Sequence, residues 1–109
     1  MRNVMFALAG VALTGLTLNA QAREIRPDDR FMCSWGAGTA ARAQELKLVG
    51  VSRYAAREKI QTIKFTKGWM RMMALGITEQ TYDSGSNAKP AVVRETFYDG
   101  CIHYKLARR

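Results

Sequence analysis

The chain has few of the residues from which catalytic and metal sites are built. It contains a single histidine, His103, and two cysteines, Cys33 and Cys101, which do not form a Cys-x-x-Cys motif. No serine or cysteine nucleophile stands in a recognisable pattern with that histidine. Carboxylates such as Glu58 and Glu95 show no pairing that the sequence favours over a solvated surface. We therefore expect a protein that is not an enzyme, with no cofactor and no metal site.

Long apolar runs are absent except at the N-terminus. Arg2 precedes an apolar stretch over residues 4–18 that has no acidic residue, and Ala20-Gln21-Ala22 then offers the small-x-small pattern cut by signal peptidase. The stretch is shorter than the roughly 20 residues of a spanning helix. These features predict a signal peptide over residues 1–22, cleaved after Ala22, and one domain over residues 23–109. We expect a periplasmic or secreted protein with no transmembrane segment after cleavage.

Acidic residues are also scarce, with 9 Asp and Glu against 17 Lys and Arg, for a net charge of +8. A positive surface favours anionic partners, which in a bacterial envelope are lipid phosphates, lipopolysaccharide and wall polymers, whereas nucleic acid is not expected there. The candidate anion-contacting residues follow one another along the middle of the chain. They are Arg53, Arg57, Lys64, Lys67 and Arg71. A simple solvated helix face is the alternative interpretation.

The two cysteines lie near opposite ends of the expected domain. An even count in an oxidising compartment favours one disulfide between Cys33 and Cys101. Closing a loop of this length removes roughly 4 kcal/mol of unfolded-state entropy in the simple chain model. The bridge is therefore expected to supply much of the stability of so small a domain.

Hydrophobic periodicity predicts an all-α fold, a compact bundle of about four short helices with the disulfide joining the first and the last. The predicted helices cover about 29–49, 52–65, 66–82 and 90–104. Asp28 and Asp29 are expected to cap the first helix, and Ser52 the second. Residues 83–89 are typical of a loop. The last helix also suits a strand, because residues 92–98 include several β-branched and aromatic side chains.

The periodicity also predicts which side chains are buried. The expected inward positions are Ala56, Ile60 and Ile63 in the second helix, Trp69, Met72, Met73, Gly76, Ile77 and Gln80 in the third, and Val93, Thr96, Phe97, Gly100, Cys101 and Tyr104 in the last. Gly36 and Gly38 each cost about 1 kcal/mol of helix propensity. They are easiest to explain if a partner backbone or a large side chain lies against them.

Methionines gather at Met70, Met72 and Met73, and Met32 lies upstream. Thioethers could bind Cu(I) in the periplasm, but methionine also fills irregular gaps in a core, and the absence of a histidine cluster favours packing. A candidate patch for a protein partner consists of Met32, Trp35 and Leu46, on the far side of the first helix. The alternative is that Ile25 and Phe31 of the preceding segment cover it.

The chain resembles small secreted helical proteins of proteobacteria with a single cysteine pair. The resemblance rests on Cys33 opening an Ala-rich helix, the Gly50-Val51-Ser52 turn, and Tyr98 three residues before Cys101. It implies a helical fold and carries no activity to transfer. In size, helix content and cysteine layout the chain is also similar to the HdeA-like acid-stress chaperones. We expect an envelope-associated binding or interaction module, with a periplasmic stress chaperone as the alternative.

Overall fold

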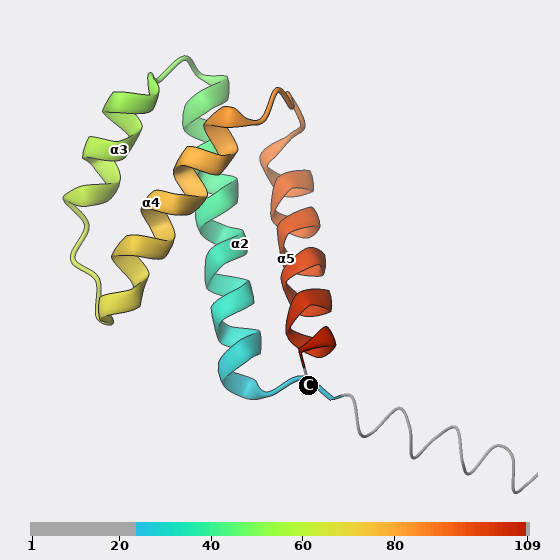
Figure 1. Cartoon of the computed structure of the whole chain (residues 1–109). Coiled ribbons are helices and arrows are strands. Elements are labelled where there is room, and N and C mark those ends of the chain that lie inside the picture. Colours follow the sequence, from blue (N-terminus) through green and yellow to red (C-terminus); the bar gives the residue numbers. More distant parts are fainter. Residues whose placement is uncertain (1–23, 109) are drawn as a thin grey trace, which may run out of the picture.

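Residues 24–108 of the computed structural model form four helices and no strand (Figure 1). The helices are α2 (Pro27–Leu48), α3 (Arg53–Gln61), α4 (Gly68–Asp83) and α5 (Pro90–Ala107). The predicted all-α bundle is therefore confirmed, and the last segment is a helix.

The predicted signal peptide, residues 1–22, lies outside the described residues. None of the four described helices is both long enough and apolar enough to cross a membrane.

The longest helix, α2, is the centre of the bundle. It packs against α5 along one side and against α4 on another, and α3 packs mainly on α4 (Figure 1). The buried residues of α2 are mostly small, which lets its neighbours approach closely; they are Cys33, Gly36, Ala37, Ala40, Ala41, Ala43, Gln44 and Leu46. Because α2 has neighbours on several sides, its buried residues are not confined to a single stripe along the helix.

The start of α2 differs from the prediction. The N-cap residue is Arg26, and Pro27 takes the first helical position. Proline suits this position because its ring fixes φ near the helical value. Asp28 and Asp29 lie inside the first turn, so the predicted cap position is wrong. Their charge still suits the positive end of the helix dipole.

The disulfide joins Cys33 of α2 to Cys101 of α5, with a Cα–Cα distance of 5.5 Å. It links the first and last described helices, as predicted. Cys33 is fully buried, and Cys101 is half-buried. The bridge thus ties together two elements separated by 68 positions in the sequence.

Helix α3 begins as predicted and ends earlier. Ser52 caps it by accepting a hydrogen bond from the Ala55 amide at 3.1 Å. The helix stops at Gln61, because the chain must turn over residues 62–67 before α4 can run back beside α3. Ile63 consequently lies in this loop with 46% of its surface exposed, so its predicted burial is wrong.

The buried face of α4 is rotated from the predicted stripe. Met70 is only 5% exposed, whereas Met72, predicted to be buried, is 78% exposed. Of the predicted stripe, Ile77 is buried, Trp69 and Met73 are half-buried, and Gly76 and Gln80 are exposed. The cause is that α4 contacts both α2 and α3, so the side facing between them is buried; this face consists of Met70, Ala74, Ile77 and Thr78.

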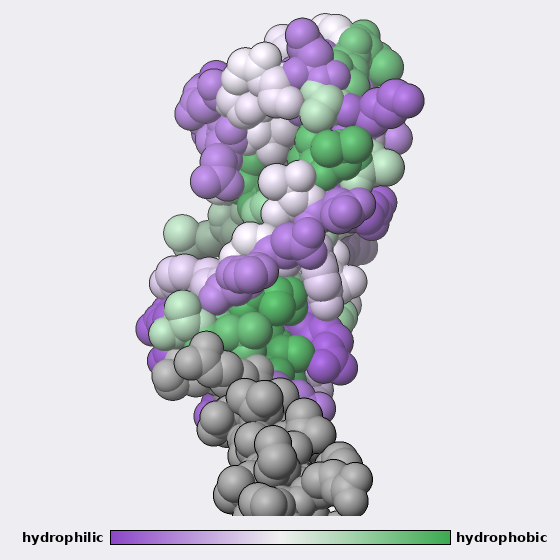
Figure 2. Space-filling view, turned by 90° about the vertical axis from the view of Figure 1, so that its right-hand side faces the viewer, coloured by the Kyte–Doolittle hydropathy of each residue, from purple (hydrophilic) through white to green (hydrophobic). Residues whose placement is uncertain are grey.

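Helix α5 has no fully buried residue, because among the described elements it packs against α2 alone. Val93, Phe97 and Cys101 are half-buried on the inner side. The predicted burial of Tyr104 is wrong, since 58% of its surface is exposed; Thr96 and Gly100 are exposed too. Figure 2 shows the face on which α5 lies, with apolar clusters above and below a diagonal band of hydrophilic side chains.

Candidate functional site

A groove of about 510 Å³ lies between α2, the α3–α4 loop and α4. Apart from Arg42 and Lys64, its larger lining side chains are apolar or aromatic: Trp35, Ile60, Ile63, Phe65 and Met70. Two other cavities in the described part of the chain are smaller. Volumes of roughly 300–1,000 Å³ are usual for small-molecule sites, which are mostly apolar.

The groove exists because α3 diverges from α2. Helix α3 packs against α4 and has only slight contact with α2, so its C-terminal end and the loop over residues 62–67 stand away from the central helix (Figure 1). Besides Trp35 and Arg42, the α2 side of the groove carries small residues, Ser34, Gly38 and Thr39, which do not fill the gap.

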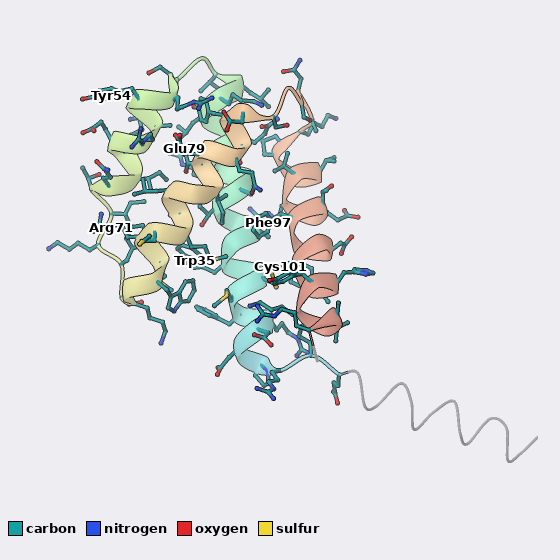
Figure 3. The ribbon with its side chains drawn as sticks, viewed as in Figure 1. Trp35, Tyr54, Arg71, Glu79, Phe97 and Cys101 are labelled. Carbon is teal, nitrogen blue, oxygen red and sulfur yellow. A yellow bond between two sulfur atoms is a disulfide. The ribbon has the colours of Figure 1, made fainter. Side chains whose placement is uncertain are left out.

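One wall of the groove is aromatic. The rings of Trp35 and Phe65 meet edge to face with their centroids 6.0 Å apart. Trp35 also packs edge to face on Trp69 at 5.3 Å, and Trp69 on Phe31 at 6.5 Å. Such pairs have a preferred geometry, so the wall is held in place by rings from α2, α4 and the loop. In Figure 3, Trp35 lies between α2 and α4.

The three residues of the candidate partner patch are not exposed together. Leu46 is buried at 6% exposure, and Met32 and Trp35 are half-buried. Trp35 is covered by Phe65 and Trp69 rather than by the segment before α2. Of these three residues, Trp35 alone lines the groove.

Two of the candidate anion-contacting residues pair with acids of α4. Arg53 lies 2.7 Å from an oxygen of Asp83 and 3.7 Å from Glu79. Arg57 lies 3.8 Å from the other oxygen of Glu79. Figure 3 shows Glu79 on α4, facing α3. These pairs join α3 to α4 and reduce the positive charge of the expected strip.

A third candidate, Arg71, supports the loop beside the groove. Its guanidinium donates hydrogen bonds to the carbonyl oxygens of Gln61, at 2.5 Å, and Ile63, at 3.3 Å. It also lies over the Phe65 ring, 5.2 Å from the centroid. Arg71 thus fixes both the backbone and one aromatic ring of the groove wall.

The remaining two candidates, Lys64 and Lys67, are exposed, and Lys64 lines the groove. Within residues 24–108 no carboxylate lies within ion-pair distance of Lys64. Arg42, the other basic residue lining the groove, is paired with Glu45 at 2.5 Å. The sequence placed Lys64 in a basic strip but gave no sign that it borders an apolar groove, because α3 was predicted to continue past Gln61.

The two other cavities are less suited to a ligand. One, of about 260 Å³, lies beside Gln44, whose amide is bonded to the carbonyl oxygens of Ser86 and Ala88. The other, of about 490 Å³, lies between α2 and α5 and is lined largely by polar and charged side chains. The first is lined by no basic residue, and the second has Arg30 and Arg94 but only one aromatic side chain, Tyr98. Among residues 24–108 no cluster of three His, Cys, Asp or Glu side chains could hold a metal ion.

Neither a protein-family model, nor a curated protein, nor a solved structure matches this chain.

Proposed function

We propose that the chain is an exported, non-enzymatic binding protein of the cell envelope, and that the groove is its binding site. The observation that carries this proposal is an apolar groove of ligand size with an aromatic wall. A bound ligand would make van der Waals contacts with the sides of the Trp35 and Phe65 rings that line the groove.

Export is supported by two independent features. The N-terminal sequence has the charge, apolar run and small-x-small pattern of a secretory leader. The Cys33–Cys101 disulfide is compatible with an extracellular or periplasmic protein, because disulfides persist in oxidising compartments.

The export proposal is tested by the mass of the protein recovered from a bacterial envelope fraction. We expect a chain that begins at Arg23 and lacks two hydrogens because the disulfide has formed. A full-length chain with two free thiols in the cytosol would contradict it.

The binding proposal is tested with a neutral, environment-sensitive naphthylamine dye. Saturable binding of one dye per chain is expected, with a change in tryptophan fluorescence, because Trp35 lines the groove and Trp69 packs against it. Ile63→Gln should weaken binding by roughly tenfold, because the substitution removes apolar surface from the wall. Val49→Gln is the matched control, since Val49 is exposed and does not line the groove.

Two results would contradict the binding proposal. One is binding that does not saturate, and the other is equal loss of affinity in the Ile63 and Val49 variants. Either result would mean that the dye adsorbs to the surface and does not enter the groove.

One observation favours the chaperone alternative. Helix α5 packs on α2 by a single side and has no fully buried residue, so its release would uncover the inner face of α2. If the protein is a chaperone, it should suppress aggregation of an unfolded client when α5 is released, and a variant with α5 held in place should not.

A further inference from the structure

We infer that the ligand of the groove is a single-chain amphiphile with a carboxylate head, whose head lies at Lys64 and whose chain lies along the aromatic wall. This inference rests on the proposed function, because it names the class of ligand that the same groove takes.

The interior of the groove offers few free hydrogen-bond donors. The Thr39 hydroxyl donates to the Trp35 carbonyl at 3.1 Å, and the Thr66 hydroxyl donates to the Met70 sulfur at 3.7 Å. Apart from Arg42 and Lys64, the larger side chains beside them are apolar or aromatic. A sugar or a peptide would leave its own polar groups without partners there, which is costly, whereas an alkyl chain has none to satisfy.

The charge of the groove lining is positive by about one unit. Glu45 neutralises Arg42, and no Asp or Glu is among the described residues that line the groove. Lys64 has no carboxylate partner within residues 24–108. A single unpaired ammonium group beside an apolar surface complements a head group with one negative charge.

Lys64 is held beside the groove by its neighbours. Arg71 binds the carbonyl oxygens of Gln61 and Ile63, and the second of these belongs to the residue directly before Lys64. The same guanidinium lies over Phe65, the residue directly after it. The loop is therefore ordered before a ligand arrives, which lowers the entropic cost of binding.

The size of the groove suits one chain. A volume of about 510 Å³ lies in the lower half of the range of roughly 300–1,000 Å³ found for small-molecule sites. This favours a fatty-acid-like ligand over a phospholipid with two acyl chains.

The test uses the mature, oxidised protein with three ligands that differ only in the head: dodecanoate, dodecanol and dodecyltrimethylammonium. All are kept below the concentration at which they form micelles, and binding is measured by calorimetry and by tryptophan fluorescence. Dodecanoate should bind most tightly and the cationic ligand least tightly. Lys64→Gln should weaken dodecanoate binding by roughly threefold to tenfold and leave dodecanol binding unchanged.

Lys89→Gln is the matched control for this test. Lys89 is exposed and lines none of the three cavities, so the variant has the same net charge as Lys64→Gln without altering the groove. If the two variants lose dodecanoate affinity equally, the attraction comes from the overall charge, and the assignment of the head to Lys64 is overturned.

Chain length gives a second, independent readout. From octanoate to decanoate to dodecanoate, affinity should rise by about fourfold for each methylene that enters the groove. Affinity that does not depend on chain length would overturn the placement of the chain.

The outcomes separate this inference from the proposed function. Equal binding of the three head groups would overturn the ligand class and leave the groove as a binding site. Binding of the neutral dye without binding of any of the three amphiphiles would also overturn the ligand class and leave the groove as a binding site. If neither the dye nor any amphiphile binds, both proposals fail. Binding to anionic vesicles without binding of monomeric dodecanoate would replace the groove ligand with a membrane surface.

Discussion

The Phe97 ring occupies the space that a side chain on Gly36 would need. A Cβ atom at Gly36 would lie 2.7 Å from Cε1 of Phe97 and 2.8 Å from the terminal methyl carbon of Met73. Side chains from α5 and α4 therefore converge on one residue of α2. This contact explains why the centre of a helix keeps a residue of low helix propensity.

Gly36→Ala should lower the free energy of unfolding by about 1–2 kcal/mol, although alanine is the better helix former. The methyl end of Met73 can move aside, but the Phe97 ring is stiff and must shift with α5. Chemical denaturation of the purified variant measures the change.

Gly38→Ala is the control for this prediction. A Cβ atom there would meet only the Arg94 guanidinium, at an ordinary 3.5 Å, so we expect a gain of up to about 1 kcal/mol. If Gly36→Ala were as stabilising as Gly38→Ala, the close contact with Phe97 would be absent in solution. Phe97→Leu should relieve part of the Gly36→Ala loss in a double-mutant cycle.

Cys101→Ser should lower the melting temperature strongly, because α5 is fastened to α2 by one side and by the disulfide. The chain model gives roughly 4 kcal/mol for a loop of this length, which corresponds to a fall of about 15 °C or more in a small domain. Thermal unfolding measures it. Wild-type protein in reductant should fall to a similar melting temperature, and no change in either sample would mean that the bridge does not stabilise the fold.

Gln44→Leu should destabilise the protein by about 1–3 kcal/mol, because the Ala88 carbonyl loses its donor and the Ser86 carbonyl keeps only Lys47. The Gln44 side chain is 1% exposed and donates to Ser86 at 3.1 Å and to Ala88 at 2.8 Å. Faster proteolysis within residues 84–89 is the expected sign that the loop has been released. Gln80→Leu, at an exposed position, should change neither measurement.

The free energy of unfolding should fall at alkaline pH because Tyr82 ionises there. Burial raises the pKa of Tyr82 above its usual value of 10.0, and the phenol donates a hydrogen bond to the Val51 carbonyl at 2.7 Å. The folded state thus holds this proton more tightly than the unfolded chain does, so the free energy of unfolding falls as the pH rises above 10.

Tyr82→Phe should remove this part of the alkaline decline, and Tyr54→Phe, at an exposed position, should leave it in place. Denaturation midpoints measured from neutral to alkaline pH give the comparison. The same slope in the Tyr82 variant and the wild type would show that another group is responsible.

The sequence was sufficient to predict features that depend on residue type and on the neighbouring residues in the chain, rather than on how the helices pack. Ser52 caps α3 by its own side chain, and the Cys33–Cys101 pair follows from the cysteine count and the expected compartment. The need for a close neighbour at Gly36 was also evident from its cost to the helix.

Features that depend on tertiary packing were not predicted from the sequence. The burial of Leu46 and Met70 results from how α2 and α4 are surrounded, which the period of a single helix does not reveal. The groove depends on where α3 ends, and the β-branched pair Thr62-Ile63 fits a helical period although it lies in the loop. Pairing of Arg53 with Asp83 needs two helices side by side, so it could not be inferred from either helix alone.

Isotope-filtered nuclear Overhauser contacts between labelled protein and unlabelled dodecanoate show directly where the ligand lies. We predict contacts from the ligand methylenes to the Trp35 ring and the methyl groups of Ile60 and Ile63, which line the groove. Contacts confined to Val93 and Phe97, in the cavity beside α5, or no contacts at saturating ligand, would mean that the groove does not bind dodecanoate.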